Sequence, residues 1–386
     1  MKEYNWRDER EKFRPDFQQK KEAPAVQPPP EEPRTDPRKI IAVIAGVIVI
    51  ALIAVGVYFF INNNKSEGKG TGGPDSDTEL IAAPPPVKDS ATMLAEAAEK
   101  HKNAVGVVVV TLEISNGKKL TNEIGTAWAF AENKFATNAH VAVAIKEAAQ
   151  QLKIQLASAL LMNYAKGEGC NDLDALKKKV GEAKFEQLCN EAIQLAQQNT
   201  KSVSAAIFIN GTHGKSYAIT HYQIHPRYGE HGTALDPDVA ILTIQGKHDT
   251  FFKIAKQDTL HSLKAGDPIA FLGFPMENIN NVNLDNPVAS MQTGNIVAVS
   301  DFQLKDSGKD GNLLIRHNLP SAGGASGSPI FNVKGEVVAL HFGGSKIRIT
   351  KDGPRIDPGS MINMSVRVDL LEGMGSDDRP ISDMFE

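Results

Sequence analysis

Three residues, far apart in the chain, are of types that can together break an acyl bond. Ser326 lies in the segment GASGSP (324–329), whose glycines leave the serine hydroxyl open and let backbone N–H groups face an incoming carbonyl. His140 directly follows a short apolar run, and Asp238 begins another apolar run. A hydroxyl, an imidazole base and a carboxylate that orients the base meet the needs of acyl transfer. We therefore predict that His140, Asp238 and Ser326 are catalytic.

Other histidines raise the question of a metal site. His213, His221, His225 and His231 lie within 19 residues, but their spacing is not a zinc signature and no cysteine is near. Neither this cluster nor the rest of the sequence implies a metal or another cofactor. The net charge of −4 gives no basic surface for nucleic acid, so we expect no nucleic-acid partner.

The elements that must position these residues are mostly strands. Short runs rich in valine, isoleucine and alanine, bounded by glycine, asparagine and aspartate, predict an all-β barrel or sandwich. The runs are 105–114, 125–130, 134–138, 204–210, 239–244, 268–274 and 336–342. Residues 142–200 differ, because they lack proline and show helical spacing of apolar residues, which predicts two or three amphipathic helices.

Both cysteines of the chain fall in this helical segment. Cys170 lies at a predicted turn between helices and Cys189 in the last helix. In an oxidising compartment a disulfide between them would add about 3 kcal/mol of stability. We predict this disulfide; two unpaired thiols are the alternative, favoured if the segment is cytosolic.

The amino-terminal part contains a candidate membrane helix. Residues 40–61 are uncharged and apolar, and 22 residues in a helix span about 33 Å, enough for a bilayer core. The run is too long for a cleaved signal peptide, and no small-residue cleavage site follows it. We predict a retained signal anchor at 40–61, with a disordered cytoplasmic tail at 1–39 and a flexible linker at 62–90.

Five blocks in the carboxyl-terminal two thirds resemble a chymotrypsin-fold serine peptidase of the bacterial trypsin-like type, near the HtrA-like and glutamyl-endopeptidase branches. The blocks are GTAW (125–128), TNAH (137–140), IHPRY (224–228) leading to DVAIL (238–242), GFP (273–275) and GASGSP (324–329). The resemblance implies two packed six-stranded antiparallel β-barrels with the site between them. Residues 91–370 would form this domain, with 142–200 as a helical insertion and 371–386 as a tail. We expect no PDZ domain after Ser326.

The resemblance also implies the role of each residue. Ser326 would be the nucleophile, His140 the general base and Asp238 the residue that orients His140. Asp236 is a rival acid, although Asp238 fits the family spacing. The N–H groups of Gly324 and Ser326 would form the oxyanion hole. Ala325 departs from the family, where the residue before the nucleophile is polar, and this change could loosen the oxyanion loop.

Substrate preference rests on residues flanking the nucleophile. Glutamyl endopeptidases hold an acidic side chain with a serine or threonine and a histidine, which correspond to Ser321 and His341, and Gly343 would border the same pocket. A partly positive imidazole beside a hydroxyl suits a carboxylate. Pro320 stands where trypsin has an acid, so cleavage after arginine or lysine is not expected.

The sequence thus predicts a serine endopeptidase at the inner membrane of a cell. The chain would cross the membrane once, with its amino terminus in the cytoplasm and its peptidase domain in the periplasm or another extracytoplasmic space. Proteins or peptides would be its substrates, and the helical insertion could bind a further partner. The alternative is a catalytically silent or gated trypsin-like scaffold that binds a partner at the membrane.

Overall fold

The structure is a computed structural model that describes residues 88–230, 236–275, 282–343, 347–350, 353–356 and 362–385. The predicted tail at 1–39, the predicted membrane helix at 40–61 and most of the predicted linker lie outside the described residues. Within the described part of the chain, no helix is both long enough and apolar enough to cross a bilayer.

The first barrel has six antiparallel strands in the order β1-β2-β3-β6-β5-β4 and closes because β4 also pairs with β1 and β5 with β6. Its strands are β1 (Val105–Ile114), β2 (Lys119–Ala131), β3 (Lys134–Thr137), β4 (Thr200–Ile209), β5 (Ser216–Ile224) and β6 (Ala240–Ile244). Alternate residues of β1 face two different apolar cores, with Val107 and Val109 in one and Val108 and Val110 in the other. Both faces of this strand are buried, which explains its unbroken valine run.

The second barrel repeats the plan with the strand order β11-β8-β9-β10-β15-β12, closed by the pairing of β11 with β12. Its strands are β8 (Pro268–Gly273), β9 (Ser290–Ser300), β10 (Leu314–His317), β11 (Pro329–Asn332), β12 (Glu336–Gly343) and β15 (Asn363–Arg367). Strand β7 (Lys253–Ile254) adds to its edge, and a hairpin of β13 (Ile347–Thr350) and β14 (Gly353–Ile356) separates β12 from β15. One apolar core contains residues of both barrels, such as Trp128 and Phe271. The predicted pair of six-stranded antiparallel barrels is therefore confirmed.

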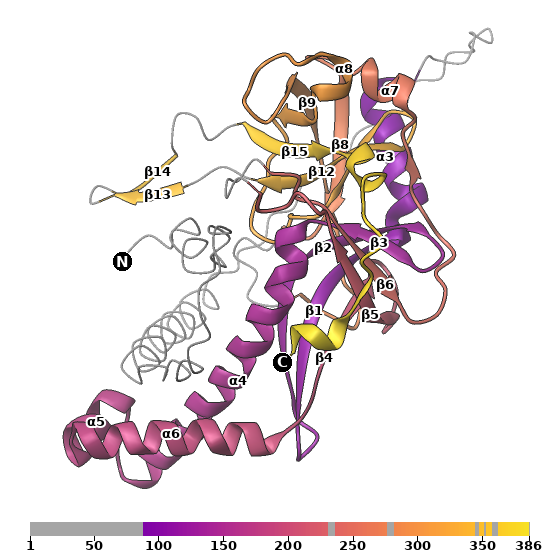
Figure 1. Cartoon of the computed structure of the whole chain (residues 1–386). Coiled ribbons are helices and arrows are strands. Elements are labelled where there is room, and N and C mark those ends of the chain that lie inside the picture. Colours follow the sequence, from indigo (N-terminus) through magenta and orange to yellow (C-terminus); the bar gives the residue numbers. More distant parts are fainter. Residues whose placement is uncertain are drawn as a thin grey trace, which may run out of the picture.

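The helical insertion projects from the first barrel. It consists of α4 (Ala139–Gly167), α5 (Leu173–Val180) and α6 (Glu182–Asn199), and α5 and α6 lie at the far end of α4 (Figure 1). The buried side chains of α4 recur every three or four residues, as in Val141, Ile145, Ala148 and Leu152, so one stripe of the helix packs inward. This helix begins three residues before the predicted insertion and therefore includes His140.

The predicted disulfide is wrong: Cys170 and Cys189 are both free thiols. Cys170 lies just beyond the end of α4, where its sulfur contacts the carbonyl of Glu168, whereas Cys189 lies in the middle of α6. Both are buried in the apolar core that the insertion shares with the first barrel. Burial raises the pKa of the Cys189 thiol, and nearby Glu186 raises it further. The two cysteines thus act as small core residues.

Short elements complete the domain at both ends. Helix α3 (Ser90–His101) is capped by Asp89, which accepts a hydrogen bond from the N–H of Thr92 at 2.7 Å. The region expected as a tail contains β16 (Arg379–Pro380), which pairs with β5, and the 3-10 turn η3 (Ile381–Met384), which packs on the first barrel and α4. The remaining helical turns are η1 (Lys102–Ala104), α7 (Gln257–His261), α8 (Gly308–Gly311) and η2 (Val368–Leu371).

Candidate active site

His140 and Asp238 meet where β3 ends beside β6. Thr137, the last residue of β3, pairs with Ala240, the first residue of β6, so the residues just outside this pair come together. One carboxylate oxygen of Asp238 lies 2.6 Å from Nδ1 of His140, and the other accepts the backbone N–H of His140 at 2.9 Å. Asn138 adds a hydrogen bond of 2.8 Å from its side-chain amide to the carbonyl of Asp238. The acid is therefore held against both the backbone and the ring of the histidine.

This contact determines which nitrogen of the imidazole can act as a base. An ionised carboxylate only accepts hydrogen bonds, so Nδ1 of His140 carries the ring proton and Nε2 has a free lone pair. The side chain of Asp238 is only 4% exposed, whereas that of His140 is 33% exposed. Solvent and a substrate can therefore reach the His140 side chain, while the carboxylate of Asp238 behind it is shielded.

Ser326 comes from the loop between β10 and β11 of the second barrel, and its backbone packs on the first. The N–H of Thr126 in β2 donates to the carbonyl of Ser326 at 2.9 Å. A Cβ atom on Gly125 would lie 2.8 Å from the side chain of Val141 and 3.2 Å from the carbonyl oxygen of Ser326. The nucleophile loop thus approaches the residue that follows His140, although the described residues show no hydrogen bond between the Ser326 hydroxyl and the imidazole.

The backbone of the loop leaves two N–H groups free. Ala325 donates its N–H to Ala322, Gly327 to His341, and Ser328 to Ala325. Across the described residues, the N–H groups of Gly324 and Ser326 have no acceptor. These are the two groups that the sequence predicted as oxyanion donors.

The predicted pocket residues Ser321 and His341 are in contact and belong to a longer polar chain. The Ser321 hydroxyl lies 2.5 Å from Nε2 of His341. Nδ1 of His341 faces Nε2 of His317 at 3.4 Å, and that nitrogen also faces the hydroxyl of Ser365 at 2.9 Å. Gly343, the third predicted residue, ends β12 two residues beyond His341. The structure therefore adds His317 and Ser365, which lie in the short strands LIRH and NMSVR and which no motif in the sequence marks.

The imidazoles of His317 and His341 are both neutral because they are buried. Burial lowers the pKa of His317 to about 3. Burial also holds the pKa of His341 well below its usual value, and the charges that His317 and His140 would carry lower it further. The partly positive ring expected from the sequence is therefore replaced by a neutral hydrogen-bonding ring.

The rival acid and the extra histidines occupy other places. Asp236 is buried, but the contacts to His140 come from Asp238. His225 accepts the N–H of Arg227 on Nδ1 at 3.2 Å, and burial lowers its pKa. Nδ1 of His221 lies 3.1 Å from the hydroxyl of Thr220. His231 lies outside the described residues.

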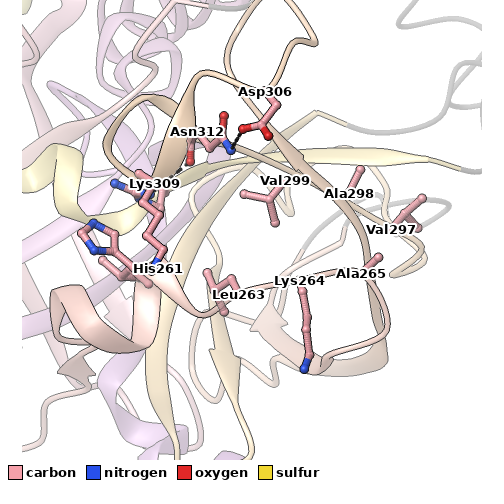
Figure 2. Close-up of a pocket in the computed structure, with 12 residues that line it drawn as sticks. His261, Leu263, Lys264, Ala265, Val297, Ala298, Val299, Asp306, Lys309 and Asn312 are labelled. Carbon is pink, nitrogen blue, oxygen red and sulfur yellow. Dashed lines mark hydrogen bonds between the residues drawn. The ribbon is translucent and has the colours of Figure 1, made fainter.

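A separate hollow of about 380 Å³ lies on the second barrel between α7, β9 and the α8 turn (Figure 2). Leu263 and Val299 line it together with Lys309 and Arg367. The guanidinium of Arg367 forms a two-pronged ion pair with Asp369, at 2.8 and 2.7 Å, and donates to backbone carbonyls. None of His140, Asp238 and Ser326 lines this hollow, so it is distinct from the candidate active site.

Comparison with known proteins identifies a matching family. Residues 125–340 match the trypsin-like peptidase domain family, which is more than half of the chain. No curated protein matches the chain. Similar solved structures include the HtrA-type protease AlgW with a decapeptide, at 14% identity and a TM-score of 0.41 over 72% of this chain and 67% of that one. Another is the Rv3671c protease from M. tuberculosis in its active form, at 14% identity and a TM-score of 0.37 over 79% of this chain and 92% of that one.

The matched residues run from Gly125, beside the candidate nucleophile loop, to Leu340, next to the pocket histidine. They include most strands of both barrels, the histidine–aspartate pair and the serine loop, whereas β1 and β15 lie outside the matched range. The chain belongs to the trypsin-like peptidase family.

Proposed function

We propose that this chain is a membrane-anchored serine endopeptidase that hydrolyses protein or peptide substrates through His140, Asp238 and Ser326. The observation that carries the proposal is the double contact between Asp238 and His140. It leaves Nε2 of a partly exposed imidazole free to accept a proton, on the side from which a serine hydroxyl must approach.

In the first half of the reaction, the Ser326 hydroxyl attacks the scissile carbonyl carbon and its proton passes to Nε2 of His140. The new C–O bond pushes the carbonyl electrons onto oxygen, and the N–H groups of Gly324 and Ser326 stabilise that negative charge. Asp238 stabilises the imidazolium. His140 then returns the proton to the leaving amine as the C–N bond breaks, which leaves an acyl-enzyme.

In the second half, water takes the place of the amine. His140 removes a proton from the water, whose oxygen attacks the acyl carbon and forms a second tetrahedral intermediate in the same oxyanion site. The C–O bond to Ser326 breaks as His140 protonates the serine oxygen, so the acid product leaves and the enzyme is restored. The hydroxyl and imidazole need not be hydrogen-bonded without substrate, because catalytic hydrogen bonds often tighten only in the complex.

The finer part of the proposal is a preference for cleavage after an acidic residue. The N–H of Leu319 donates to Nδ1 of His317 at 3.3 Å, so this neutral ring carries its proton on Nε2. That nitrogen faces Nδ1 of His341, which favours the tautomer of His341 with its proton on Nε2, toward Ser321. The ring N–H of the buried His341 then donates to the oxygen of Ser321, which leaves the hydroxyl proton of Ser321 to donate to an oxygen of a glutamate side chain.

Membrane anchoring is supported by the apolar segment 40–61 alone. We place the amino terminus in the cytoplasm and the peptidase domain outside it. An anchored full chain should stay in the membrane pellet after alkaline extraction, and a protease added to intact spheroplasts should degrade its peptidase domain. The double variant Ile50→Arg/Leu52→Arg should weaken retention, because each charge at the centre of a membrane helix costs about 3 kcal/mol.

The catalytic proposal is tested with the full chain in detergent. The wild type should react with a fluorophosphonate probe and cleave casein, and Ser326→Ala should do neither while keeping the same thermal unfolding. Ser262→Ala, which removes an exposed hydroxyl beyond α7, is the matched control and should retain full activity. If the wild type neither labels nor cleaves any peptide of a diverse library, the chain is a silent scaffold instead.

The preference for an acidic residue is tested with peptides that differ only at the residue before the cleaved bond. Glutamate should be cleaved best and glutamine next, since both present an oxygen acceptor to the pocket, and alanine least. Ser321→Ala should lower kcat/KM for the glutamate peptide by about 10-fold more than for the alanine peptide. Equal losses for both peptides would refute the assigned pocket but not the catalytic residues.

A further inference from the structure

Thr126 in β2 connects the first barrel to the nucleophile loop of the second, and all of its polar atoms are used. Its N–H donates to the carbonyl of Ser326 at 2.9 Å, and its hydroxyl donates to the carbonyl of Gly324 at 2.9 Å. The hydroxyl accepts the N–H of Phe274 at 3.1 Å, and its own carbonyl accepts the hydroxyl of Thr137 at 2.7 Å. The residue is completely buried.

Beyond its backbone hydrogen bonds, the loop has few side-chain anchors of its own. Ala325, between the two carbonyls that Thr126 binds, has only a methyl group and is completely buried. The Ser328 hydroxyl is buried and has no hydrogen-bond partner within the described part of the chain. Gly324 has φ of +88°, a backbone region that only glycine enters freely, so it is an easy point of rotation.

The loop is also held from the other barrel at close range. A Cβ atom on Gly327 would overlap the carbonyl oxygen of Thr126 and the hydroxyl of Thr137, so glycine is needed for the approach. The carbonyls of Gly324 and Ser326, both bound by Thr126, belong to the peptide groups 324–325 and 326–327, which flank the peptide group that carries the N–H of Ser326. The N–H of Ser326, which no described residue accepts, is therefore held in one direction.

We propose that Thr126 is a positioning residue that holds the oxyanion loop in its working conformation and takes the place of an anchor that Ala325 lacks. This inference rests on the proposed function, since it assigns a role within the same site. The side-chain hydrogen bond to Gly324 is the part that substitution can remove, because the backbone N–H to Ser326 remains in every variant.

The test compares Thr126→Val, which keeps the shape and removes the hydroxyl, with Thr126→Ser, which keeps it. With the full chain in detergent and a peptide that the wild type cleaves, Thr126→Val should lower kcat by about 10- to 100-fold with little change in KM. Thr126→Ser should restore most of the loss. The matched control is Thr243→Val, which removes a buried hydroxyl that binds Lys134 instead of the loop, and it should keep wild-type kcat.

A peptide boronate gives a readout that a merely structural role would not change. It forms a tetrahedral adduct with the nucleophile, so its inhibition constant should rise in Thr126→Val by the same factor by which kcat/KM falls. If Thr126→Val does not fold, Thr126→Cys, whose thiol is a weak donor, should show an intermediate loss.

The proposal is overturned if a folded Thr126→Val retains wild-type kcat, if Thr126→Ser is as impaired as Thr126→Val, or if only KM changes. A wild type that cleaves no peptide would refute the proposed function itself. Failure of the role assigned to Thr126 can thus be distinguished from failure of the proposed peptidase function.

Discussion

Asp238 contacts His140 through both carboxylate oxygens, one on the ring nitrogen at 2.6 Å and one on the backbone N–H at 2.9 Å. The backbone contact exists because His140 is in the first turn of α4, where an N–H has no partner inside the helix. The same buried acid therefore orients both the imidazole ring and the first turn of α4. The position at which α4 begins thus helps to set the orientation of the base.

The first prediction concerns the identity of the acid. Asp238→Asn keeps the shape of the side chain but allows its amide to donate to Nδ1, which moves the ring proton to Nε2 and removes the base. We expect kcat to fall by about 10⁴-fold with the fold intact, measured by peptide hydrolysis and thermal unfolding. Asp236→Asn, the neighbouring buried acid, is the control. An equal loss in both variants would contradict the assignment of Asp238.

The second prediction concerns the contact between the barrels at Gly125. In Gly125→Ala the new methyl would lie 2.8 Å from the Val141 side chain and 3.2 Å from the Ser326 carbonyl, so β2 and the nucleophile loop must separate. We expect a loss of about 1–3 kcal/mol in the free energy of unfolding and a lower kcat. Gly167→Ala, at the end of α4 with open space around it, should not reduce either quantity.

The third prediction concerns acid stability. The pKa of His317 is about 3 in the folded chain and 6.5 ordinarily, so the unfolded chain binds one more proton at this ring between these values. The contribution of this ring to the free energy of unfolding is fully present above pH 6.5. It is lost as the pH falls toward 3, by about 1.4 kcal/mol per pH unit. His317→Asn should make the dependence of the unfolding free energy on pH shallower by that amount between pH 6 and pH 4. An unchanged slope in urea titrations would show that the ring is protonated when folded.

The fourth prediction concerns the carboxyl-terminal turn η3. Met384 is 6% exposed and lies in the core shared by the first barrel and the insertion, and Lys153 of α4 donates to the carbonyl of Phe385 at 3.2 Å. Met384→Ala should cost about 2–5 kcal/mol in the free energy of unfolding, since it leaves a cavity beside α4. The control Ser382→Ala changes an exposed side chain of the same turn and should have little effect. Equal stabilities in urea denaturation would show that the turn does not contribute to the core.

The sequence was sufficient for the features that depend on local pattern. Runs of β-branched residues between turns predicted the strands, and the three-to-four spacing of apolar residues predicted the helices of the insertion. The motifs around His140, Asp238 and Ser326 predicted candidate catalytic residues, and the structure brings the first two into contact. Local patterns could reveal these features because each strand, helix and motif is defined by residues that lie close together in the sequence.

Only the tertiary structure decided the features that depend on contacts between distant segments. Whether Cys170 and Cys189 pair depends on how two helices pack, and the spacing of the cysteines does not determine that packing. The pairing of β10 with β15 places the ring of His317 beside the Ser365 hydroxyl, and Thr126 reaches Gly324 across 198 residues. The physical reason is that barrel closure sets which side chains meet, and a sequence period records the direction of a side chain without identifying its partner.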